Sequence, residues 1–413
     1  MTSENKQILI VGGGICGMAT ALACARNGVR SQVLEKSPSF GELGAGLQLG
    51  PNGIRALDTL GVAEEIRRTG RRPERYIARR ADDNSEIISF DFGTKFEEQF
   101  GAPYLVVHRG DLLDLLIKAC VDTGLVTLTS SSDVQEVVQH DDSVTAICAD
   151  GSTYEGTALI GADGLRSSIR KAVGKTDAPR STGYVAFRGA SPRVDDSVGE
   201  VAIWVYDGLH YIEYPIRDGD LLNRVAVFRV AEGTDHRDTE EMARQLRSIF
   251  HGMDENVRDA VEQLDLTRCW PMYDRDPSSG WTSGRVLLAG DAAHPMLQYL
   301  AQGGIQALED AVALGALVAK SPDDPAAVFA EFEEQRFLRT SVVQLSARFS
   351  GEVCYLPGTG AKFRDLALRG RSSDNYDVLE WLYSPNTTKE MHKTVLEFLR
   401  NIEVGDVDSL SGL

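Results

Sequence analysis

The amino-acid sequence predicts an α/β protein in which a parallel-sheet portion is interwoven with an antiparallel sheet. Three short apolar runs, at 7–11, 158–162 and 285–289, have the composition of buried parallel strands, and glycine follows each closely. Between the second and third runs, residues 183–230 change to period-two alternation, with Val201, Ile203 and Val205 on one face. Because the parallel-strand signal returns after this stretch, we expect two interwoven domains.

The first apolar run begins a βαβ unit. A small-residue helix is predicted from Ile15 to Asn27, where Gly28 ends it, and the next strand covers 31–35. Further helices are predicted at 50–61, 111–120, 236–264 and 303–320, with short strands between 126 and 154. The C-terminal part is mostly helical in pattern, and 405–413 is expected to be a frayed tail.

Composition and charge narrow the function classes. The chain has 413 residues, of which 42% are hydrophobic and 25% charged, as in ordinary globular proteins. Its 61 acidic and 43 basic residues give a net charge of −18, which disfavours nucleic-acid binding. We find no signal peptide and no apolar stretch of about 18 residues, so we predict a cytoplasmic protein without a membrane span.

Cysteine usage agrees with that location. The six cysteines contain no CxxC pair and none lies at metal-ligand spacing from histidine, so no metal site is predicted. Reduced thiols are favoured, although an even number would also allow three disulfides.

A glycine motif follows the first strand directly. Gly12, Gly14 and Gly17 form G-x-G-x-x-G between a predicted strand and a predicted helix. The first glycine permits the tight turn, the second admits a pyrophosphate, and the third lets the helix pack on the strand. Glu35, at the end of the next strand, suits a ribose diol and favours FAD or NAD over NADP. The alternative is a glycine-rich turn without a ligand.

Two further loops follow the other buried strands. Gly161-Ala162-Asp163-Gly164 and Gly290-Asp291 come at strand ends, and His108-Arg109-Gly110-Asp111-Leu112 precedes both. In this combination, from about Gln7 to Ser350, the sequence resembles the class A flavoprotein aromatic hydroxylases, which have a DG motif, a GD motif and an HR-x-DL segment. Asp163 could instead be a turn residue and Asp291 a helix N-cap. His294 is expected to be a loop histidine bonded to backbone.

The resemblance implies a Rossmann-like FAD-binding domain formed by 1–75, 102–180 and 274–345, and a substrate domain formed by 76–101 and 181–273, with a C-terminal helical region at 346–413. FAD would be held non-covalently, and NADH or NADPH would bind transiently, because no second glycine motif is present. The cofactor-binding residues implied are Gly12, Gly14, Gly17, Glu35, Lys36, Ala45, Gln48, Arg109, Val134, Asp163, Asp291, Gly303 and Gly304. The bare N-terminus of the helix at 303 would face the flavin N1–C2=O edge.

The substrate pocket is predicted from one strand. His210, Ile212 and Tyr214 alternate along 208–215, which puts them on one face, with His210 and Tyr214 about 13 Å apart. A narrower resemblance, carried by 41–50, 210–215, 270–275 and 290–300, is to the 3-hydroxybenzoate 6-hydroxylases within the family. It implies that His210 and Gln298 are catalytic at the substrate phenol, and that Tyr214 and Tyr299 bind the substrate, with Tyr214 at its carboxylate.

The implied reaction uses O2 and a flavin C4a-hydroperoxide to hydroxylate a small aromatic acid. A phenolate pushes charge to its ortho and para carbons, and a neutral histidine can take the phenol proton. The product would be a para-hydroquinone such as gentisate. Three alternatives stay open: a salicylate or hydroxynicotinate hydroxylase, a non-hydroxylating flavoprotein reductase or dehydrogenase, and a non-catalytic binding protein. The oligomeric state is also open, with a homodimer as one alternative.

Overall fold

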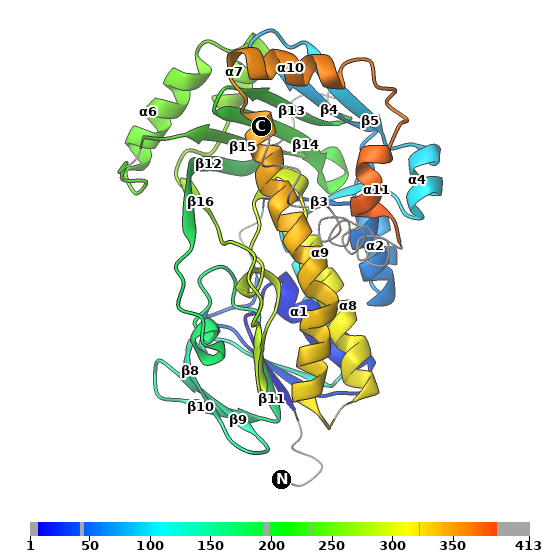
Figure 1. The fold of residues 1–413 in the computed structure, drawn as a ribbon, viewed down its shortest axis with the longest axis vertical. Coiled ribbons are helices and arrows are strands. Elements are labelled where there is room, and N and C mark those ends of the chain that lie inside the picture. The colour runs from blue at the N-terminus through cyan, green and yellow to red at the C-terminus, as the bar shows by residue number, and fades with distance from the viewer. Residues whose placement is uncertain (1–6, 42–44, 193–198, 232, 322, 386–413) are drawn as a thin grey trace, which may run out of the picture.

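The computed structural model describes residues 7–41, 45–192, 199–231, 233–321 and 323–385. Within them the strands form a six-stranded sheet, a seven-stranded sheet and two small sheets. The two large sheets lie at opposite ends of the long axis of the molecule, and helix α9 (Pro325–Cys354) runs from one to the other (Figure 1). At about 1.5 Å per residue this helix is about 45 Å long, which suits it to join both sheets.

The six-stranded sheet contains the predicted parallel strands. Its order is β17-β18-β11-β1-β2-β7, with β1 paired parallel to both β2 and β11. The strands are β1 (Ile8–Val11), β2 (Ser31–Leu34), β7 (Val126–Thr129), β11 (Ala158–Gly161), β17 (Thr282–Ser283) and β18 (Val286–Leu288). Since β1, β11 and β18 run in the same direction, the loops that follow them meet at one edge of the sheet.

Helices cover this sheet and bury its apolar side chains. The helices are α1 (Ile15–Arg26), α2 (Pro51–Thr59), α3 (Ala63–Thr69), α5 (Arg109–Asp122) and α8 (Gly303–Lys320), with the short helix η2 (Ile169–Val173) beside β18. Helices α1 and α8 pack closely, because a side chain at Gly315 would come within 2.8 Å of Ala23. A three-stranded sheet of β8 (Val134–Gln139), β9 (Val144–Cys148) and β10 (Thr153–Gly156) flanks the domain.

The seven-stranded sheet has the order β16-β12-β15-β14-β13-β4-β5 and is antiparallel except between β13 and β4. Its strands are β4 (Arg75–Arg80), β5 (Glu86–Asp91), β12 (Arg180–Pro192), β13 (Val201–Tyr206), β14 (Leu209–Ile216), β15 (Leu221–Arg229) and β16 (Trp270–Asp274). The small sheet of β3 (Gly46–Leu49) and β6 (Leu105–His108) contacts the seven-stranded sheet, because Gly46 N donates to the Asn223 side chain of β15 at 2.6 Å.

The remaining helices are α4 (Thr94–Phe100), α6 (Thr239–Phe250), α7 (Glu255–Val261), α10 (Gly358–Leu368) and α11 (Asp377–Tyr383). The expectation of one continuous helical segment at 236–264 is wrong in detail, because residues 251–254 separate α6 from α7. Asp254 caps α7 by accepting from Asn256 N, and such side-chain caps favour a new helix start. The predicted tail at 405–413 lies outside the described residues.

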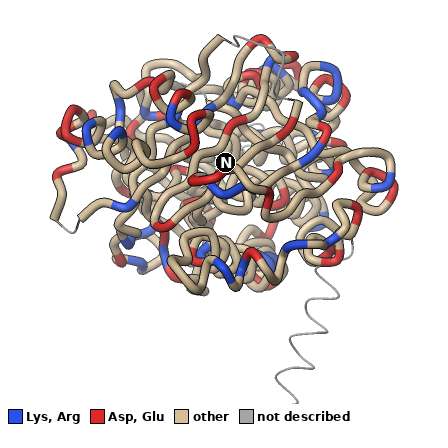
Figure 2. The backbone as a smooth tube through the Cα atoms, turned by 90° about the horizontal axis from the view of Figure 1, so that it is seen from above, with Lys and Arg blue, Asp and Glu red and all other residues tan. Residues whose placement is uncertain are grey.

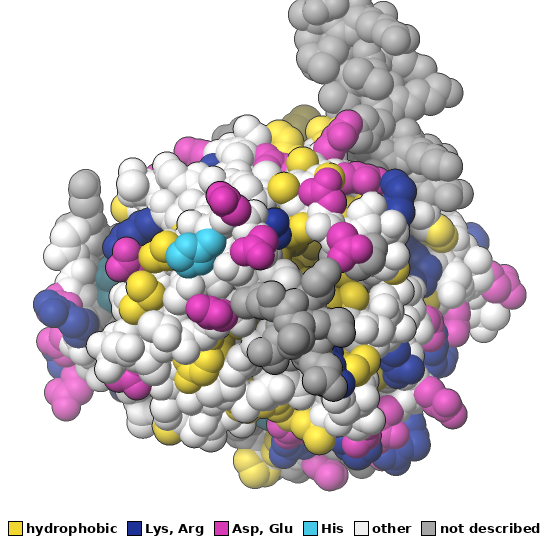
Figure 3. Space-filling view, turned by 90° about the horizontal axis from the view of Figure 1, so that it is seen from below, with side chains coloured by type: hydrophobic (Ala, Val, Ile, Leu, Met, Phe, Trp, Pro, Cys, Tyr) yellow, Lys and Arg dark blue, Asp and Glu magenta, His cyan; other side chains and the backbone are white. Residues whose placement is uncertain are grey.

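The surface is mixed in charge. Acidic and basic residues are interspersed around the described chain (Figure 2), although the sequence as a whole carries −18. On the lower face, hydrophobic side chains lie singly or in small groups between polar and charged ones (Figure 3). Among the described residues, no helix combines the length and the apolar composition that crossing a bilayer requires.

The glycine turn provides a test of the fold. A Cβ on Gly17 would lie 1.9 Å from the Gly12 carbonyl oxygen, whereas a Cβ on Gly14 would meet no atom within 4 Å. We therefore expect Gly17→Ala to cost about 1–3 kcal/mol of unfolding free energy or more, because β1 and α1 must separate. Gly14→Ala should leave the ligand-free Tm nearly unchanged. Thermal unfolding of both variants checks this, and equal Tm losses would contradict it.

Candidate active site

A cavity of about 790 Å³ opens at the edge where β1, β11 and β18 end. We call it the dinucleotide cavity. Its lining includes the predicted residues Gly12, Gly14, Glu35, Lys36, Arg109, Val134, Asp163, Asp291, Gly303 and Gly304. Gly17 does not line it and instead lies behind, against Gly12, which is the packing role expected of the third glycine. The cavity therefore brings together residues from opposite ends of the described chain, such as Gly12 and Gly304.

Glu35 lines this cavity and is fixed by two hydrogen bonds. Its carboxylate accepts hydrogen bonds from Gly13 N at 2.7 Å and from Ser37 N at 2.9 Å, so it is fixed in place. Gly14 leaves open space above the start of α1, and α8 begins at Gly303 without a side-chain cap. Free N–H groups at two helix starts suit a pyrophosphate and an anionic ring edge. These features fit a bound dinucleotide.

The two predicted acidic loops differ in what they hold. Asp163 Oδ2 accepts from Ser168 N at 2.7 Å and from Ser168 Oγ at 3.2 Å, so this carboxylate stabilises the turn before η2, as the turn alternative expects. Asp291 lies in the short helix η4 (Gly290–Ala292) and makes no side-chain cap bond there. Its carboxylate lines the cavity, where an acceptor for ligand hydroxyls is useful.

A second cavity, of about 440 Å³, adjoins the first and shares Arg109, Asp291, Gly303 and Gly304 with it. We call it the aromatic cavity. The seven-stranded sheet contributes His210, Ile212 and Tyr214 from β14, as the alternation predicted. The other predicted residues that line it are Ala45, Gln48, Gln298 and Tyr299, the last two from the short helix η5 (Gln298–Leu300). Tyr383 closes it from α11, a contribution that no local pattern indicated.

His210 is 2% exposed and neutral. Burial lowers the pKa of its imidazole to about 3. Nδ1 lies 2.7 Å from the Tyr355 hydroxyl, and that hydroxyl accepts from Tyr299 at 3.0 Å. Because Nδ1 has this partner, Nε2 is the nitrogen available to the aromatic cavity. Tyr355, at the C-terminal end of α9, was missed by the sequence analysis.

Tyr214 is 4% exposed, and burial raises the pKa of its phenol well above its ordinary value. Its ring packs so closely on Gly46 that a Cβ there would come within 2.5 Å. Nearby, the Gln48 side chain accepts from the Tyr104 hydroxyl at 2.6 Å. Tyr214 therefore remains a neutral hydrogen-bonding group at the wall that β3 and β14 share.

Arg188 on β12 is a second cavity residue that sequence analysis missed. It lines the aromatic cavity, and its guanidinium lies 4.3 Å from the centroid of the Trp270 ring. Sheet register puts Arg188 opposite Val225, which is itself opposite Ile212 between His210 and Tyr214. A cation over an aromatic face, at the wall of an apolar cavity, can balance the charge of a bound carboxylate.

Comparison with known proteins agrees with this geometry. The model of the FAD binding domain family matches residues 5–327. The chain belongs to the FAD binding domain family and is a class A flavoprotein monooxygenase. It is 36% identical over 394 residues to 3-hydroxybenzoate 6-hydroxylase 1 of Aquipseudomonas alcaligenes, covering 94% of this chain and 99% of that one.

Solved structures agree with the fold and the cofactor. Klebsiella pneumoniae HpxO in complex with FAD and uric acid superposes with a TM-score of 0.80 at 26% identity, covering 95% of this chain and 97% of that chain. A salicylate hydroxylase substrate complex gives a TM-score of 0.74 at 25% identity, covering 95% and 98%. The predictions of a Rossmann-like fold, of family and of FAD as cofactor are therefore confirmed for this monooxygenase.

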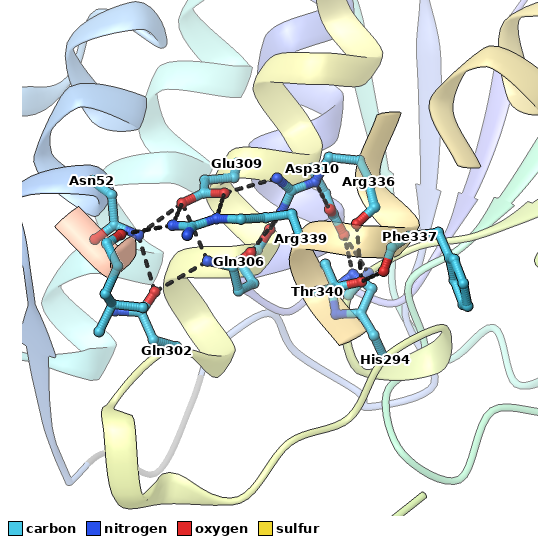
Figure 4. A network of polar contacts seen from close by, with 12 residues as sticks. Asn52, His294, Gln302, Gln306, Glu309, Asp310, Arg336, Phe337, Arg339 and Thr340 are labelled. Atoms are coloured by element: carbon cyan, nitrogen blue, oxygen red, sulfur yellow. Dashed lines mark hydrogen bonds and ion pairs between the residues drawn. The ribbon is translucent and has the colours of Figure 1, made fainter. Parts of the chain in front are cut away.

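A buried polar network lies behind the loop of this monooxygenase that carries Asp291. Asp310, on α8, is fully buried, and its carboxylate accepts from Gly290 N at 2.9 Å. It also accepts from His294 Nε2 at 2.7 Å and from Arg336 Nε at 2.7 Å (Figure 4). The expectation that His294 bonds to backbone is therefore wrong: its partner is a carboxylate that follows 16 residues later. The loop carrying Asp291 is anchored by this contact.

The network continues along α8 and α9. Glu309 pairs with Arg336 at 2.7 Å and with Arg339 at 3.2 Å, and accepts from Asn52 at 2.7 Å (Figure 4). Burial alone would raise the pKa of Glu309 and Asp310, but the neighbouring cations lower both below their ordinary values. Their contribution to stability is therefore complete above about pH 5 and is lost as the pH falls through the lowered pKa values.

Asp310→Asn tests the anchoring role. It removes the charge that balances Arg336 and one acceptor that the Gly290 loop uses, so we expect a loss of about 3–5 kcal/mol in unfolding free energy and weaker FAD retention. Chemical denaturation and FAD release on dilution measure the two effects. Glu331→Gln is the control, because it removes a partly exposed acidic group of α9 that pairs with Lys320 at the end of α8. If both variants behaved alike, the network would not anchor the loop.

Proposed function

We propose that this monooxygenase hydroxylates 3-hydroxybenzoate para to its hydroxyl group, giving 2,5-dihydroxybenzoate, with O2 and NADH or NADPH as co-substrates. One observation carries the proposal: the aromatic cavity, which adjoins the dinucleotide cavity, is lined by a neutral histidine, His210, and a cation, Arg188. A phenol needs a neutral histidine to take its proton, and a carboxylate needs a cation to balance its charge. The similarity to the Aquipseudomonas 3-hydroxybenzoate 6-hydroxylase supports the same ring substitution.

The chain's own residues would bind and activate the ring. FAD, when bound, supplies the activation of O2 after reduction by the nicotinamide. His210 Nε2 would take the phenol proton, and Gln298 would hold the phenol oxygen, so that negative charge reaches the para carbon. Tyr214 and Arg188 would bind the carboxylate at the other end of the ring. Apolar side chains such as Ile203, Ile212 and Val225 line the cavity and exclude water, which protects the reactive oxygen.

Product analysis tests the proposal. The purified holoenzyme is titrated with 2-, 3- and 4-hydroxybenzoate, and O2 uptake and products are measured with NADH and with NADPH. We expect coupled O2 uptake and 2,5-dihydroxybenzoate from the 3-isomer. Turnover of 2-hydroxybenzoate alone would favour the salicylate hydroxylase alternative. Substrate conversion without O2 uptake would indicate a reductase or dehydrogenase. If no aromatic acid were converted, the protein would be a binding protein.

Removal of the base should uncouple the reaction. We expect His210→Ala to retain FAD and its reduction by nicotinamide while hydroxylation falls about 10²–10⁴-fold. The electrons from NADH or NADPH would then reduce O2 to H2O2, which a peroxidase assay measures. Raising the pH should restore part of the hydroxylation because solvent ionises the phenol. Wild-type rate and coupling in this variant would refute the role of His210 and leave Gln298 and Tyr299 as the residues to examine.

Arg188→Gln tests recognition of the carboxylate. Loss of a charge-assisted contact costs about 1.5–3 kcal/mol, so KM for 3-hydroxybenzoate should rise roughly 10- to 150-fold. Binding of the neutral 3-hydroxybenzamide should be nearly unaffected. Arg268→Gln is the matched control, since Arg268 also lies over Trp270, at 3.7 Å, but is not among the cavity-lining residues. An equal loss for acid and amide would show that Arg188 acts through packing.

A further inference from the structure

The aromatic cavity is larger than the proposed substrate requires. Its volume is about 440 Å³, whereas a cavity of about 150 Å³ is enough to bind a benzene ring. Part of the volume lies against the wall that the aromatic cavity shares with the dinucleotide cavity, where the ring system of FAD belongs. The positions of the other lining residues therefore decide where the excess space lies.

The strand order of the large antiparallel sheet places the excess space on the side of β5. Sheet register puts Ile212 of β14 opposite Ile203 of β13, and Ile203 opposite Ala78 of β4. Tyr76 shares the sheet face of Ala78 and lies opposite Phe90 of β5. Ile203, Tyr76 and Phe90 all line the cavity. At about 4.8 Å between neighbouring strands, the spacings from β14 to β5 cover about 14 Å, which is wider than one benzoate ring.

The part of the cavity near β5 is apolar. We call it the apolar end and define it by the lining residues Tyr76, Phe90, Phe92, Ile203 and Leu379. Burial raises the pKa of the Tyr76 phenol, so this side chain is neutral. Among the described lining residues, the charged side chains lie elsewhere: Arg188 is on β12, on the other side of β14, and Arg109 and Asp291 are at the shared wall. A space with few polar groups favours a hydrocarbon group over water.

Helix α11 covers the apolar end. Leu379 of this helix lines the cavity, whereas the neighbouring Val378 is 43% exposed and is not among the lining residues. The start of the helix is fixed to the last residue of β5, because the Tyr376 hydroxyl donates to the Asp91 carbonyl at 2.7 Å. The apolar end therefore lies between the sheet and α11.

The proposed binding mode decides which carbon of the ring faces the apolar end. Hydroxylation para to the hydroxyl group joins oxygen to carbon 6, opposite carbon 3, so the line through these two carbons would run from FAD to His210. The carboxylate on carbon 1 lies on one side of this line, and carbons 4 and 5 lie on the other. Arg188 of β12 and the apolar end are on opposite sides of β14. With the carboxylate at Arg188, carbon 4 would therefore point toward the apolar end.

We propose that the substrate class of this enzyme includes 3-hydroxybenzoates with an uncharged alkyl group on carbon 4, and that the apolar end binds this group. The inference rests on the proposed function, because the orientation of the ring follows from it. Carbon 6 stays free in such a substrate, so hydroxylation would give a 4-alkyl-2,5-dihydroxybenzoate. The alkyl group would fill space that an unsubstituted ring leaves empty, and it would bury apolar surface of ligand and protein alike.

A series of ligands tests the apolar end in the wild-type enzyme. 3-Hydroxybenzoate and its 4-methyl and 4-propyl derivatives are titrated into oxidised, FAD-loaded enzyme without nicotinamide, and the change in flavin absorbance gives Kd. We expect Kd to fall about three- to fourfold for each methylene, roughly tenfold from 4-methyl to 4-propyl. With nicotinamide and O2, the 4-propyl acid should yield 2,5-dihydroxy-4-propylbenzoate.

The matched ligand is 2-propyl-3-hydroxybenzoate, which has the same apolar area on the carboxylate side of the ring. It should bind more weakly than 3-hydroxybenzoate. Equal Kd values for the 2-propyl and 4-propyl acids would overturn the inference. If 3-hydroxybenzoate were bound and hydroxylated but the 4-propyl acid bound no more tightly than the 4-methyl acid, the inference alone would be wrong. If no hydroxybenzoate were bound, the proposed function would be wrong.

A variant that fills the apolar end locates the alkyl group. We expect Leu379→Trp to abolish the tighter binding of the 4-propyl acid and to leave Kd and turnover of 3-hydroxybenzoate near their wild-type values. Val378→Trp is the matched control, because it adds the same ring to the exposed side of the same helix turn. It should retain the tenfold preference. FAD content and Tm establish that both variants are folded, and a folded Leu379→Trp enzyme with the full preference would overturn the inference.

Discussion

The contact between Asp310 and its three donors is the interaction on which the rest of this structure depends. A fully buried carboxylate is costly unless hydrogen bonds and opposite charge offset its lost hydration, and here Gly290 N, His294 and Arg336 supply both. Gly290 and His294 belong to the loop that carries Asp291, and Arg336 belongs to α9. One side chain on α8 therefore joins the loop that carries Asp291 to α8 and to the long helix that connects the two large sheets.

The same network extends to the substrate side. Arg339 pairs with Glu309 and donates to the carbonyls of Trp381 and Leu382 at the end of α11, while Arg55 donates to that of Tyr383 at 2.6 Å. The last carbonyls of a helix extend beyond its regular hydrogen-bond ladder, and here the two arginines donate to them. Tyr383 and Leu382 of α11 line the aromatic cavity. The ion pair of Glu309 and Arg339 therefore helps to hold α11 as a wall of that cavity.

The two cavities meet at Arg109, Asp291, Gly303 and Gly304, and this shared wall is where an aromatic ring and the redox ring of FAD can come together. The chain is strongly acidic overall, yet the two cavities are lined by Lys36, Arg109 and Arg188 and by the uncapped start of α8. Local positive potential inside an acidic protein favours small anions in the cavities, while the outer surface repels polyanions.

The sequence by itself determined the features that depend on short segments. The glycine motif, Glu35, the two acidic loops and the common face of His210 and Tyr214 could be predicted, because strand alternation and glycine spacing are local signals. The family resemblance added FAD. Only the tertiary structure decided the partners: Tyr355 lies 145 residues from His210, Asp310 receives His294 from a separate element, and Arg188 reaches the cavity by pairing of β12 with β15. No spacing along the chain encodes such contacts, since they form only when buried polar groups from distant elements must satisfy one another.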